Sequence, residues 1–242
     1  MKQTALITGA SKRIGKAIAL YLAENGWNIA VHYNTSYPEA DELVTSLAIK
    51  YTSQIFRAFR ADLKKPEEVE SLIPSVLQAF GGIDLLINNA SVFEPAYLKE
   101  TSAAFFEHQI AVNLKAPFLL MRDFANLCHN GNIINFVDTR ITSSKSDFAV
   151  YTLSKKALWE LTRMAALEFA PAIRVNAIAP GVTLAPEGKG DEYLTELAEK
   201  TPMKKPGGVE PVVRSLNFIL ENDHLTGQLI FADGGENLGQ NA

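Results

Sequence analysis

The sequence predicts an α/β fold in which a doubly wound, seven-stranded parallel sheet carries helices on both faces. Short β-rich apolar runs alternate along the chain with longer segments whose apolar residues recur every three to four positions. Parallel neighbours need crossover connections, so this alternation predicts a parallel sheet covered on both sides. The 242 residues contain no internal repeat and no low-complexity linker, and a single open α/β domain over residues 1–242 is therefore expected.

The expected strands are the short apolar runs, rich in β-branched and aromatic residues. In chain order they are TALIT (4–8), NIAVHY (28–33), the strand within QIFRAFRADL (54–63), DLLINN (84–89), NIINFV (132–137), RVNAIA (174–179) and QLIFAD (228–233).

The expected helices lie between these strands. IGKAIALYLAENG (14–26) has helical apolar spacing and ends at Gly26. PEEVESLIPSVLQAF (66–80) opens with proline and acidic residues, which suit a helix N-terminus. Further helices are expected at ADELVTSLAIK (40–50), through KAPFLLMRDFANL (115–127) and from about Tyr151 to Phe169.

Composition excludes several classes of function. The net charge of −4 and the pI near 5.6 argue against a nucleic-acid or anionic-membrane surface. No apolar run is long enough to cross a bilayer, and the first residues enter a strand at once, so a cytoplasmic protein without a signal peptide is expected. Cys128 is the sole cysteine, which excludes an intrachain disulfide and suits a small buried side chain. The four histidines lack metal-ligand spacing, and no metal site is expected.

TGASKRIG (8–15) lies between the first strand and the first helix, where the pyrophosphate of a dinucleotide docks in a Rossmann-type fold. Gly9 permits a tight turn, and Gly15 lets the helix approach the backbone closely. Arg13 can direct its guanidinium toward the phosphates or the substrate. The alternative, an exposed arginine at a helix start, is disfavoured because the helix dipole prefers anions there.

The end of the second strand favours NADP(H) over NAD(H). Enzymes that use NAD usually place Asp or Glu there, on the adenosine ribose. This chain reads VHYNTSYP, with Lys12, Arg13, Thr35 and Ser36 nearby and no acid before Glu39. A carboxylate would repel the 2′-phosphate, so its absence points to NADPH. Asp62 is expected at the adenine edge, and residues 88–90 (NNA) are expected to line the cofactor cleft.

Residues 181–208 form an irregular insertion rich in proline, glycine and charge. In an open α/β sheet, ligands bind outside the carboxyl ends of the strands. The insertion follows the sixth strand and is expected to hang over that edge, so residues from about 182 to 208 are interpreted as a mobile substrate lid. The alternative is a solvated excursion without a function in binding.

Six motifs in family order make the chain resemble the short-chain dehydrogenase/reductase family over essentially its whole length. They are TG-x-x-x-x-x-G at 8–15, NNA at 88–90, Asn113, Tyr151-x-x-x-Lys155, PG at 180–181 and ADGG at 232–235. The resemblance implies that Tyr151 is the general acid, that Lys155 lowers the tyrosine pKa and binds the nicotinamide ribose, and that Asn113 anchors a water chain. It also implies a homotetramer built through the helices after strands four and five.

One departure from the family pattern narrows the resemblance. The family usually has serine thirteen positions before the tyrosine, and this chain has Asp138. With TGASKRIG, HYNTS and NNASVFEP, this resembles the pteridine reductase branch and the related bacterial dihydromonapterin reductases. That branch implies a pterin stacked on Phe93, with Ser91 and Arg13 in contact with pterin and cofactor phosphate. Asp138 is then expected to hydrogen-bond Tyr151 and to take part in proton delivery. Thr35 departs from the arginine that pteridine reductases can carry for the 2′-phosphate.

The predicted site follows from these motifs. Its catalytic residues are Asp138, Tyr151, Lys155 and Asn113, and its substrate-binding residues are Arg13, Ser91, Phe93, Asp138 and Tyr151. The predicted cofactor-binding residues are Gly9, Lys12, Arg13, Ile14, Gly15, His32, Tyr33, Asn34, Thr35, Ser36, Asp62, Leu63, Asn89, Ala90, Ser91, Tyr151, Lys155, Pro180, Gly181, Val182 and Thr183.

The chemistry favours a C=N bond over a ketone as the reduced group. Reduction of a carbonyl needs an oxyanion donor, and an anionic aspartate beside a developing alkoxide is costly. Reduction of a pterin C=N bond puts hydride on carbon and a proton on nitrogen, and a carboxyl group can relay that proton. The alternatives are a turn or cap for Asp138 and an apolar packing role for Phe93. Three functions follow: a reductase of dihydropterin or dihydrofolate, a reductase of a 3-oxoacyl thioester or sugar, and a non-catalytic NADP-binding regulator.

Overall fold

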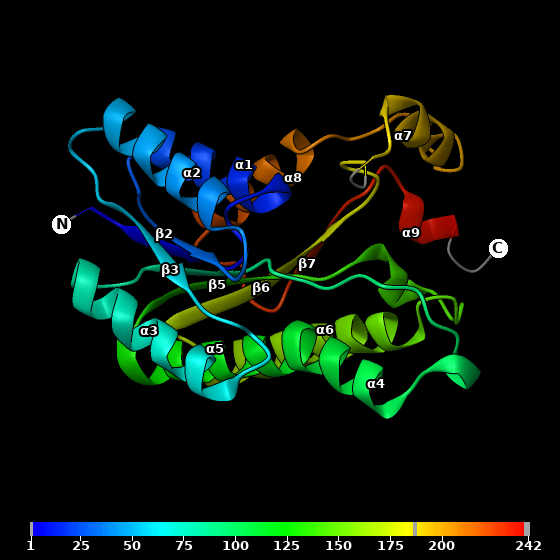
Figure 1. The fold of residues 1–242 in the computed structure, drawn as a ribbon, viewed down its shortest axis with the longest axis horizontal. Coiled ribbons are helices and arrows are strands. Elements are labelled where there is room, and N and C mark those ends of the chain that lie inside the picture. The colour runs from blue at the N-terminus through cyan, green and yellow to red at the C-terminus, as the bar shows by residue number, and fades with distance from the viewer. Residues whose placement is uncertain (1, 186–187, 240–242) are drawn as a thin grey trace.

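In the computed structural model, residues 2–185 and 188–239 are described, and seven parallel strands form one sheet between two layers of helices (Figure 1). The strand order is β3-β2-β1-β4-β5-β6-β7, so it reverses direction between β1 and β4. The predicted doubly wound α/β fold is confirmed. The strands are β1 (Thr4–Ile7), β2 (Asn28–Tyr33), β3 (Phe56–Arg60), β4 (Leu85–Asn88), β5 (Gly131–Phe136), β6 (Ile173–Pro180) and β7 (Leu229–Ala232).

Each face of the sheet has its own apolar core. Helices α1 (Arg13–Glu24), α2 (Tyr37–Lys50) and α8 (Glu210–Glu221) cover one face, where Ile18, Leu43 and Leu216 are fully buried. Helices α3 (Pro66–Phe80), α5 (Ala116–Cys128) and α6 (Ala149–Phe169) cover the other, around Phe124 and Leu120. Strands buried on both faces read as continuous apolar runs, which is why the sequence pattern located them.

Several helix boundaries differ from the expected ones. α2 begins at Tyr37, because Pro38 occupies a first-turn position where its missing N–H costs nothing. α6 begins at Ala149, so Tyr151 lies in its first turn. α4 (Ala103–Ile110) joins α5 through a π-helical turn, η2 (Ala111–Lys115), and the predicted long helical region is thus two helices and a turn. The helices of the described residues include none long and apolar enough to cross a bilayer.

The carboxyl ends of the strands form the edge at which α7 (Asp191–Ala198) and α9 (Glu236–Gly239) lie (Figure 1). The expected lid over 182–208 starts and ends here, because the Gly207 amide donates to the Val182 carbonyl at 3.0 Å. The Met203 amide donates to the Gly234 carbonyl at 3.1 Å and joins the segment to the turn after β7. Residues 186–187 of this predicted lid lie outside the described residues, and the mobility of the lid stays a prediction.

Candidate active site

Tyr151 and Asp138 meet at the carboxyl edge of the sheet. Asp138 follows β5, Tyr151 projects from the first turn of α6, and the phenol donates a 2.7 Å hydrogen bond to Oδ2 of the aspartate. The tyrosine is 5% exposed. The structure therefore brings together the two groups that the sequence placed thirteen residues apart.

The second carboxylate oxygen of Asp138 caps the short 3-10 helix η3 (Thr139–Thr142). Oδ1 accepts the Arg140 amide at 2.8 Å, while Asp138 itself has an extended backbone. The capping interpretation and the functional one are therefore compatible, because each uses a different oxygen of one carboxylate. The cap fixes the direction in which the other oxygen faces Tyr151.

Burial controls the electrostatics of the pair. It raises the pKa of Tyr151 well above its ordinary value, and the Asp138 charge raises it further. Burial lowers the pKa of Lys155 to about 8. The Lys155 ammonium donates to the Phe136 carbonyl at 2.8 Å and lies 5.7 Å from the Tyr151 ring centroid. The pKa of Tyr151 is raised in this structure, contrary to the expected lowering by Lys155, so Tyr151 is a neutral proton donor at pH 7.

Asn113 positions the loop after β4. Its Oδ1 accepts hydrogen bonds from Ser91 Oγ (3.0 Å) and from the Val92 amide (2.9 Å). Its Nδ2 donates to the Val92 carbonyl (2.9 Å) and to Gln109 Oε1 (3.2 Å). An asparagine side chain has two acceptor positions and two donor hydrogens, and all four are used. Asn113 was predicted to anchor a water chain, but its side chain binds the Val92 backbone, Gln109 and Ser91. It thereby fixes Ser91 beside Tyr151.

A stack of aromatic rings borders the Tyr151 hydroxyl. Phe93, which is 53% exposed, stacks on Phe148 with a centroid distance of 4.2 Å and an interplanar angle of 5°. The Phe93 and Tyr151 rings form a T-shaped pair with a centroid distance of 4.7 Å. The Arg140 guanidinium covers the Phe148 ring at 4.4 Å and forms a bidentate ion pair with Asp147. The arrangement offers a flat, partly exposed aromatic surface next to a proton donor.

The phosphate loop has the shape that a dinucleotide needs. Gly9 has a φ of +64°, and a Cβ on Gly15 would lie 2.3 Å from the Gly9 carbonyl oxygen and 2.7 Å from Asn89 Nδ2. Asn89 Nδ2 donates to the Thr8 and Gly9 carbonyls at 2.9 and 3.2 Å. The described first turn of α1 has neither an acidic residue nor a side-chain cap. Its amide groups therefore suit a pyrophosphate.

Comparisons with known proteins identify the family. The model described as enoyl-(acyl carrier protein) reductase matches residues 9–237. The 3-oxoacyl-[acyl-carrier-protein] reductase FabG of Staphylococcus epidermidis is 31% identical over 243 residues, which cover 97% of this chain and 99% of that protein. The chain belongs to the short-chain dehydrogenase/reductase family. Members of this family are oxidoreductases, and the expectation of an enzyme of this class is confirmed.

Solved structures of the family resemble the chain over nearly its full length. The FolM alternative dihydrofolate reductase 1 of Brucella suis, in complex with NADP, has a TM-score of 0.91 at 35% identity and covers 98% of this chain and 95% of its own. A blue fluorescent protein from a metagenomic library, in complex with NADPH, has a TM-score of 0.89 at 27% identity, with 97% of each chain covered. The resemblance of the sequence to the pteridine-reductase-like part of the short-chain reductases is confirmed.

Arg13 has an unexpected partner for a phosphate-loop residue of this family. Its guanidinium donates to the Ala185 carbonyl (Nη1, 2.7 Å) and to the Leu184 carbonyl (Nη2, 3.0 Å). Arg13 also has a φ of +54°, which is rare for a residue other than glycine. Arg13 was expected to contact the phosphate and the substrate, but in this structure its guanidinium is bonded to the first residues of the predicted lid.

An exposed ion pair between Lys12 and Glu39 lies where the ribose of the cofactor is expected. Lys12 Nζ lies 2.9 Å from Glu39 Oε1, and both side chains are about two-fifths exposed. Among the predicted residues, Tyr33 ends β2 and Asn34, Thr35 and Ser36 follow it; none of the four is an acid. An exposed ion pair of this kind contributes little to stability, and a 2′-phosphate can compete for the lysine.

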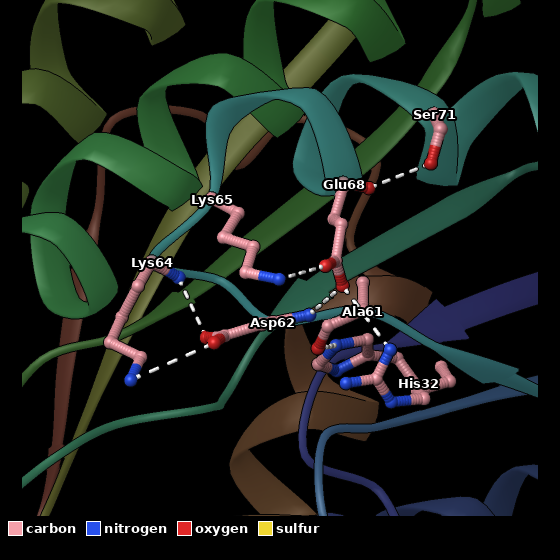
Figure 2. A network of polar contacts seen from close by, with 8 residues as sticks. His32, Ala61, Asp62, Lys64, Lys65, Glu68 and Ser71 are labelled. Carbon is pink, nitrogen blue, oxygen red and sulfur yellow. Dashed lines mark hydrogen bonds and ion pairs between the residues drawn. The ribbon is translucent and has the colours of Figure 1, made fainter.

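Figure 2 shows the polar contacts that hold Asp62, the residue predicted at the adenine edge, after the carboxyl end of β3. Glu68 accepts hydrogen bonds from the Asp62 amide (2.7 Å) and from Lys65 Nζ (2.8 Å). Asp62 Oδ1 accepts the Lys64 amide at 3.1 Å, and Lys64 Nζ lies 3.6 Å from Oδ2. The Asp62 side chain thus keeps a fixed position at the predicted adenine edge, while Leu63 is buried in the core behind it.

His32 connects the phosphate loop to the end of β3. Nδ1 accepts the Gly9 amide at 3.1 Å, and Nε2 lies 3.0 Å from the Ala61 carbonyl, so the tautomer with hydrogen on Nε2 satisfies both contacts. The side chain is 2% exposed. His32 was predicted to bind the cofactor, but both ring nitrogens are used by backbone groups. In this structure its role is to position Gly9.

The stability of the protein is expected to fall in acid through His32. Burial lowers its pKa to about 4, whereas the unfolded chain binds a proton near pH 6.5. The unfolded state therefore holds the extra proton between these values, and the stability present above pH 6.5 is lost as pH falls toward 4. The contribution lost between pH 7 and pH 4.5 is about 2–3 kcal/mol. Urea unfolding at both values measures it.

The control variants for this prediction are His32→Gln and His224→Gln. Glutamine can accept from Gly9 and donate to Ala61 without titrating, so His32→Gln is expected to show a smaller difference in stability between the two pH values. His224 is exposed, and its replacement is expected to leave the parental difference unchanged. An equal pH difference in His32→Gln and the parent would contradict a neutral buried His32.

The other predicted residues line the same edge of the sheet. Gly181 donates its amide to the Ala232 carbonyl at 3.1 Å, and a Cβ there would lie 2.5 Å from Asp233 Cα. Thr183 Oγ1 donates to the Gly181 carbonyl at 2.6 Å. Ile14 and Ala90 pack against the two cores, and Pro180 and Val182 flank Gly181. The part of the chain that the structure describes has no cluster of three potential metal ligands.

Sequence reasoning missed two residues near the Tyr151–Asp138 pair. Phe148 precedes α6 and stacks on Phe93; an aromatic residue three positions before the family tyrosine was the available signal. Glu236 opens α9, far along the chain, and its carboxyl group interacts electrostatically with Asp138. Only the C-terminal ADGG motif indicated that the end of the chain returns to this edge.

Proposed function

We propose that the protein is an NADPH-dependent reductase of pteridines that converts dihydropterin, dihydromonapterin or dihydrofolate to the tetrahydro form. The observation that carries the proposal is the 2.7 Å hydrogen bond from the Tyr151 phenol to Asp138. A carboxylate at this place suits a nitrogen heterocycle, because it can relay a proton to a ring nitrogen and can accept from ring N–H groups. The likeness to NADP-bound FolM alternative dihydrofolate reductases supports it.

The residues of the site divide the work of the reaction. When bound, NADPH supplies the hydride that adds to the carbon of the C=N bond. Tyr151 donates the proton to the nitrogen, and Asp138 holds the phenol in place through Oδ2. Lys155, whose ammonium donates to the Phe136 carbonyl, would bind the ribose of the cofactor. Phe93 stacks on Phe148 with one face and is 53% exposed, so it offers a stacking surface for the flat substrate. Asn113 holds Ser91 near the Tyr151 phenol.

The preference for NADPH follows from charge. An acid is absent directly after β2, and a 2′-phosphate can compete with Glu39 for the exposed ion pair of Lys12. The solved relatives with NADP and NADPH support this choice. We further propose that the enzyme acts in the cytoplasm as a homotetramer. Exposed apolar side chains on α5 and α6 support association, namely Phe118, Leu127, Leu153, Met164 and Leu167.

A second function is a carbonyl reductase for a 3-oxoacyl thioester or a sugar-type ketone. The identity of 31% to FabG of Staphylococcus epidermidis favours it, because that relative is aligned over the whole chain. In that function Asp138 serves only as the cap of η3. The cost of an anion beside a developing alkoxide argues against it.

A panel of substrates separates these functions. We expect oxidation of NADPH with 7,8-dihydropterins or dihydrofolate, and at least tenfold slower oxidation with 3-oxoacyl thioesters. Direct binding measurements with NADPH and NADH are expected to favour NADPH, since one charge-assisted contact contributes about 1.5–3 kcal/mol. Faster turnover of the oxoacyl thioesters would support the second function, and binding of NADPH without any turnover would support a regulator.

A further inference from the structure

A cavity of about 200 Å³ lies at the edge of the sheet opposite to the candidate active site. Its lining includes Gln3, which directly precedes β1, and Asn132, the second residue of β5, so it is found where the strands begin. The ends of α1 and α8, which pack side by side on one face of the sheet (Figure 1), also line it. The space is far larger than one water molecule needs and smaller than the pockets of drug-sized ligands. It suits an organic molecule smaller than a nucleotide.

The wall of this cavity contains an unpaired hydrogen-bond acceptor. Asn132 Oδ1 is shielded from solvent and has no hydrogen-bond partner among the described residues. The Tyr21 phenol, in contrast, donates to Asn217 Oδ1, so its hydrogen is used within the protein. A buried carbonyl oxygen without a donor is costly, and a ligand that donates an N–H group to Asn132 removes that cost.

The charges at the cavity favour a cation. Glu221, an exposed acid, ends α8 and belongs to the lining. α1 ends at the same cavity, and the negative end of a helix dipole attracts positive charge. Neither of these helices, both of which are described in full, has a basic residue in its last turn. Burial, followed by the charge of Glu221, raises the pKa of Tyr21, so the negative charge acts within the lining.

Nearby basic side chains are directed to other partners. Arg174 on β6 is the register partner of Asn132, but its guanidinium donates to the Leu225 carbonyl at 2.7 Å. Lys2 precedes Gln3, and its Nζ donates to Ser53 Oγ at 2.6 Å. The described residues that line the cavity include no base. They do include Trp27, and the face of an indole ring attracts ammonium and guanidinium groups.

We propose that this cavity binds a small organic cation, namely a primary amine or an alkylguanidine. Its positive group lies between the Glu221 carboxylate and the Trp27 ring and donates an N–H group to Asn132 Oδ1. Its alkyl part packs against Leu22 and Leu220, the apolar members of the lining. The site uses none of the residues assigned to the cofactor or to the reduced substrate, and it therefore goes beyond the proposed function and does not depend on it.

The fluorescence of Trp27 tests the site directly. The chain has two tryptophans, so Trp159→Phe leaves Trp27 as the only one. Titration of this variant with butylamine and with agmatine is expected to change the fluorescence saturably. Butan-1-ol, which has the size of butylamine but no charge, should give no such change. Both cations are also expected to raise the melting temperature of the parent, because they bind the folded state.

Substitutions in the lining distinguish this site from other binding of cations. Glu221→Gln removes the charge of an exposed side chain and is expected to weaken the binding of both cations at least tenfold, and Asn132→Ala should weaken it by a similar factor. Glu107→Gln removes an exposed acid from α4 and is the control, which should match the parent.

Three results would overturn the proposal: no saturable response to either cation, equal responses to butylamine and butan-1-ol, or unchanged affinity in Glu221→Gln. None of these measurements uses NADPH or a pterin. Failure of the pteridine function would therefore leave the result for this cavity unaffected.

Discussion

Tyr151→Phe is expected to reduce turnover by about 10²–10⁴-fold, the usual effect of removing a positioned acid. Phenylalanine keeps the ring that contacts Phe93, so the protein should fold and bind NADPH nearly as the parent does. The loss is expected in kcat and kcat/KM together, because the phenolic proton is needed only in the transition state. Steady-state kinetics and direct NADPH binding measure the two quantities.

The matched control for this experiment is Tyr51→Phe, which removes a phenol from the end of α2, away from the carboxyl edge. It should leave kcat unchanged. Near-normal turnover in Tyr151→Phe would mean that the proton comes from another group, and Asp138 would be the first to test.

Asp138→Ala is expected to lower dihydropterin turnover by about 10²-fold or more. Asp138→Ser, which restores the usual family residue, should not rescue it, because a hydroxyl cannot replace the charge and acceptor capacity of a carboxylate. The alanine also removes the η3 cap, which costs about 1 kcal/mol of stability. Asp138→Asn can keep the acceptor for the Arg140 amide and removes only the charge, so it separates the two effects.

Kinetics with dihydropterin and with a 3-oxoacyl thioester decide the outcome for all three variants, and NADPH binding confirms that each is folded. If Asp138→Ser reduces dihydropterin as well as the parent does, the aspartate serves only as a cap. The carbonyl-reductase function would then be the better proposal.

Local patterns were enough to predict the fold and part of the site. The central strands β1 and β4 are buried on both faces and stand out as short apolar runs, and Tyr151 and Lys155 lie one helical turn apart. The contact of Tyr151 with Asp138 followed from the family spacing and is present. The end of α4 was harder to predict, because the π-helical turn η2 shifts the helical period before α5 begins.

Contacts between distant segments could not be predicted. The partners of Arg13 lie 171 and 172 residues further along the chain and are backbone carbonyls, which have no signature in the sequence. His32 resembled a cofactor contact because it precedes the ribose residues, yet its ring points inward to Gly9 and Ala61. Side-chain direction at the end of a strand depends on the pleat, and a shift of one residue reverses it.

The packing behind the phosphate loop has a consequence for cofactor affinity. Gly15 leaves no room for a methyl group against Gly9 and Asn89, and His32 holds the Gly9 amide from the other side. The loop therefore has its binding shape before a dinucleotide arrives, and little conformational entropy remains to be lost on association. Because this packing preorganises the loop, most of the free energy of the contacts with the pyrophosphate is expressed as binding affinity.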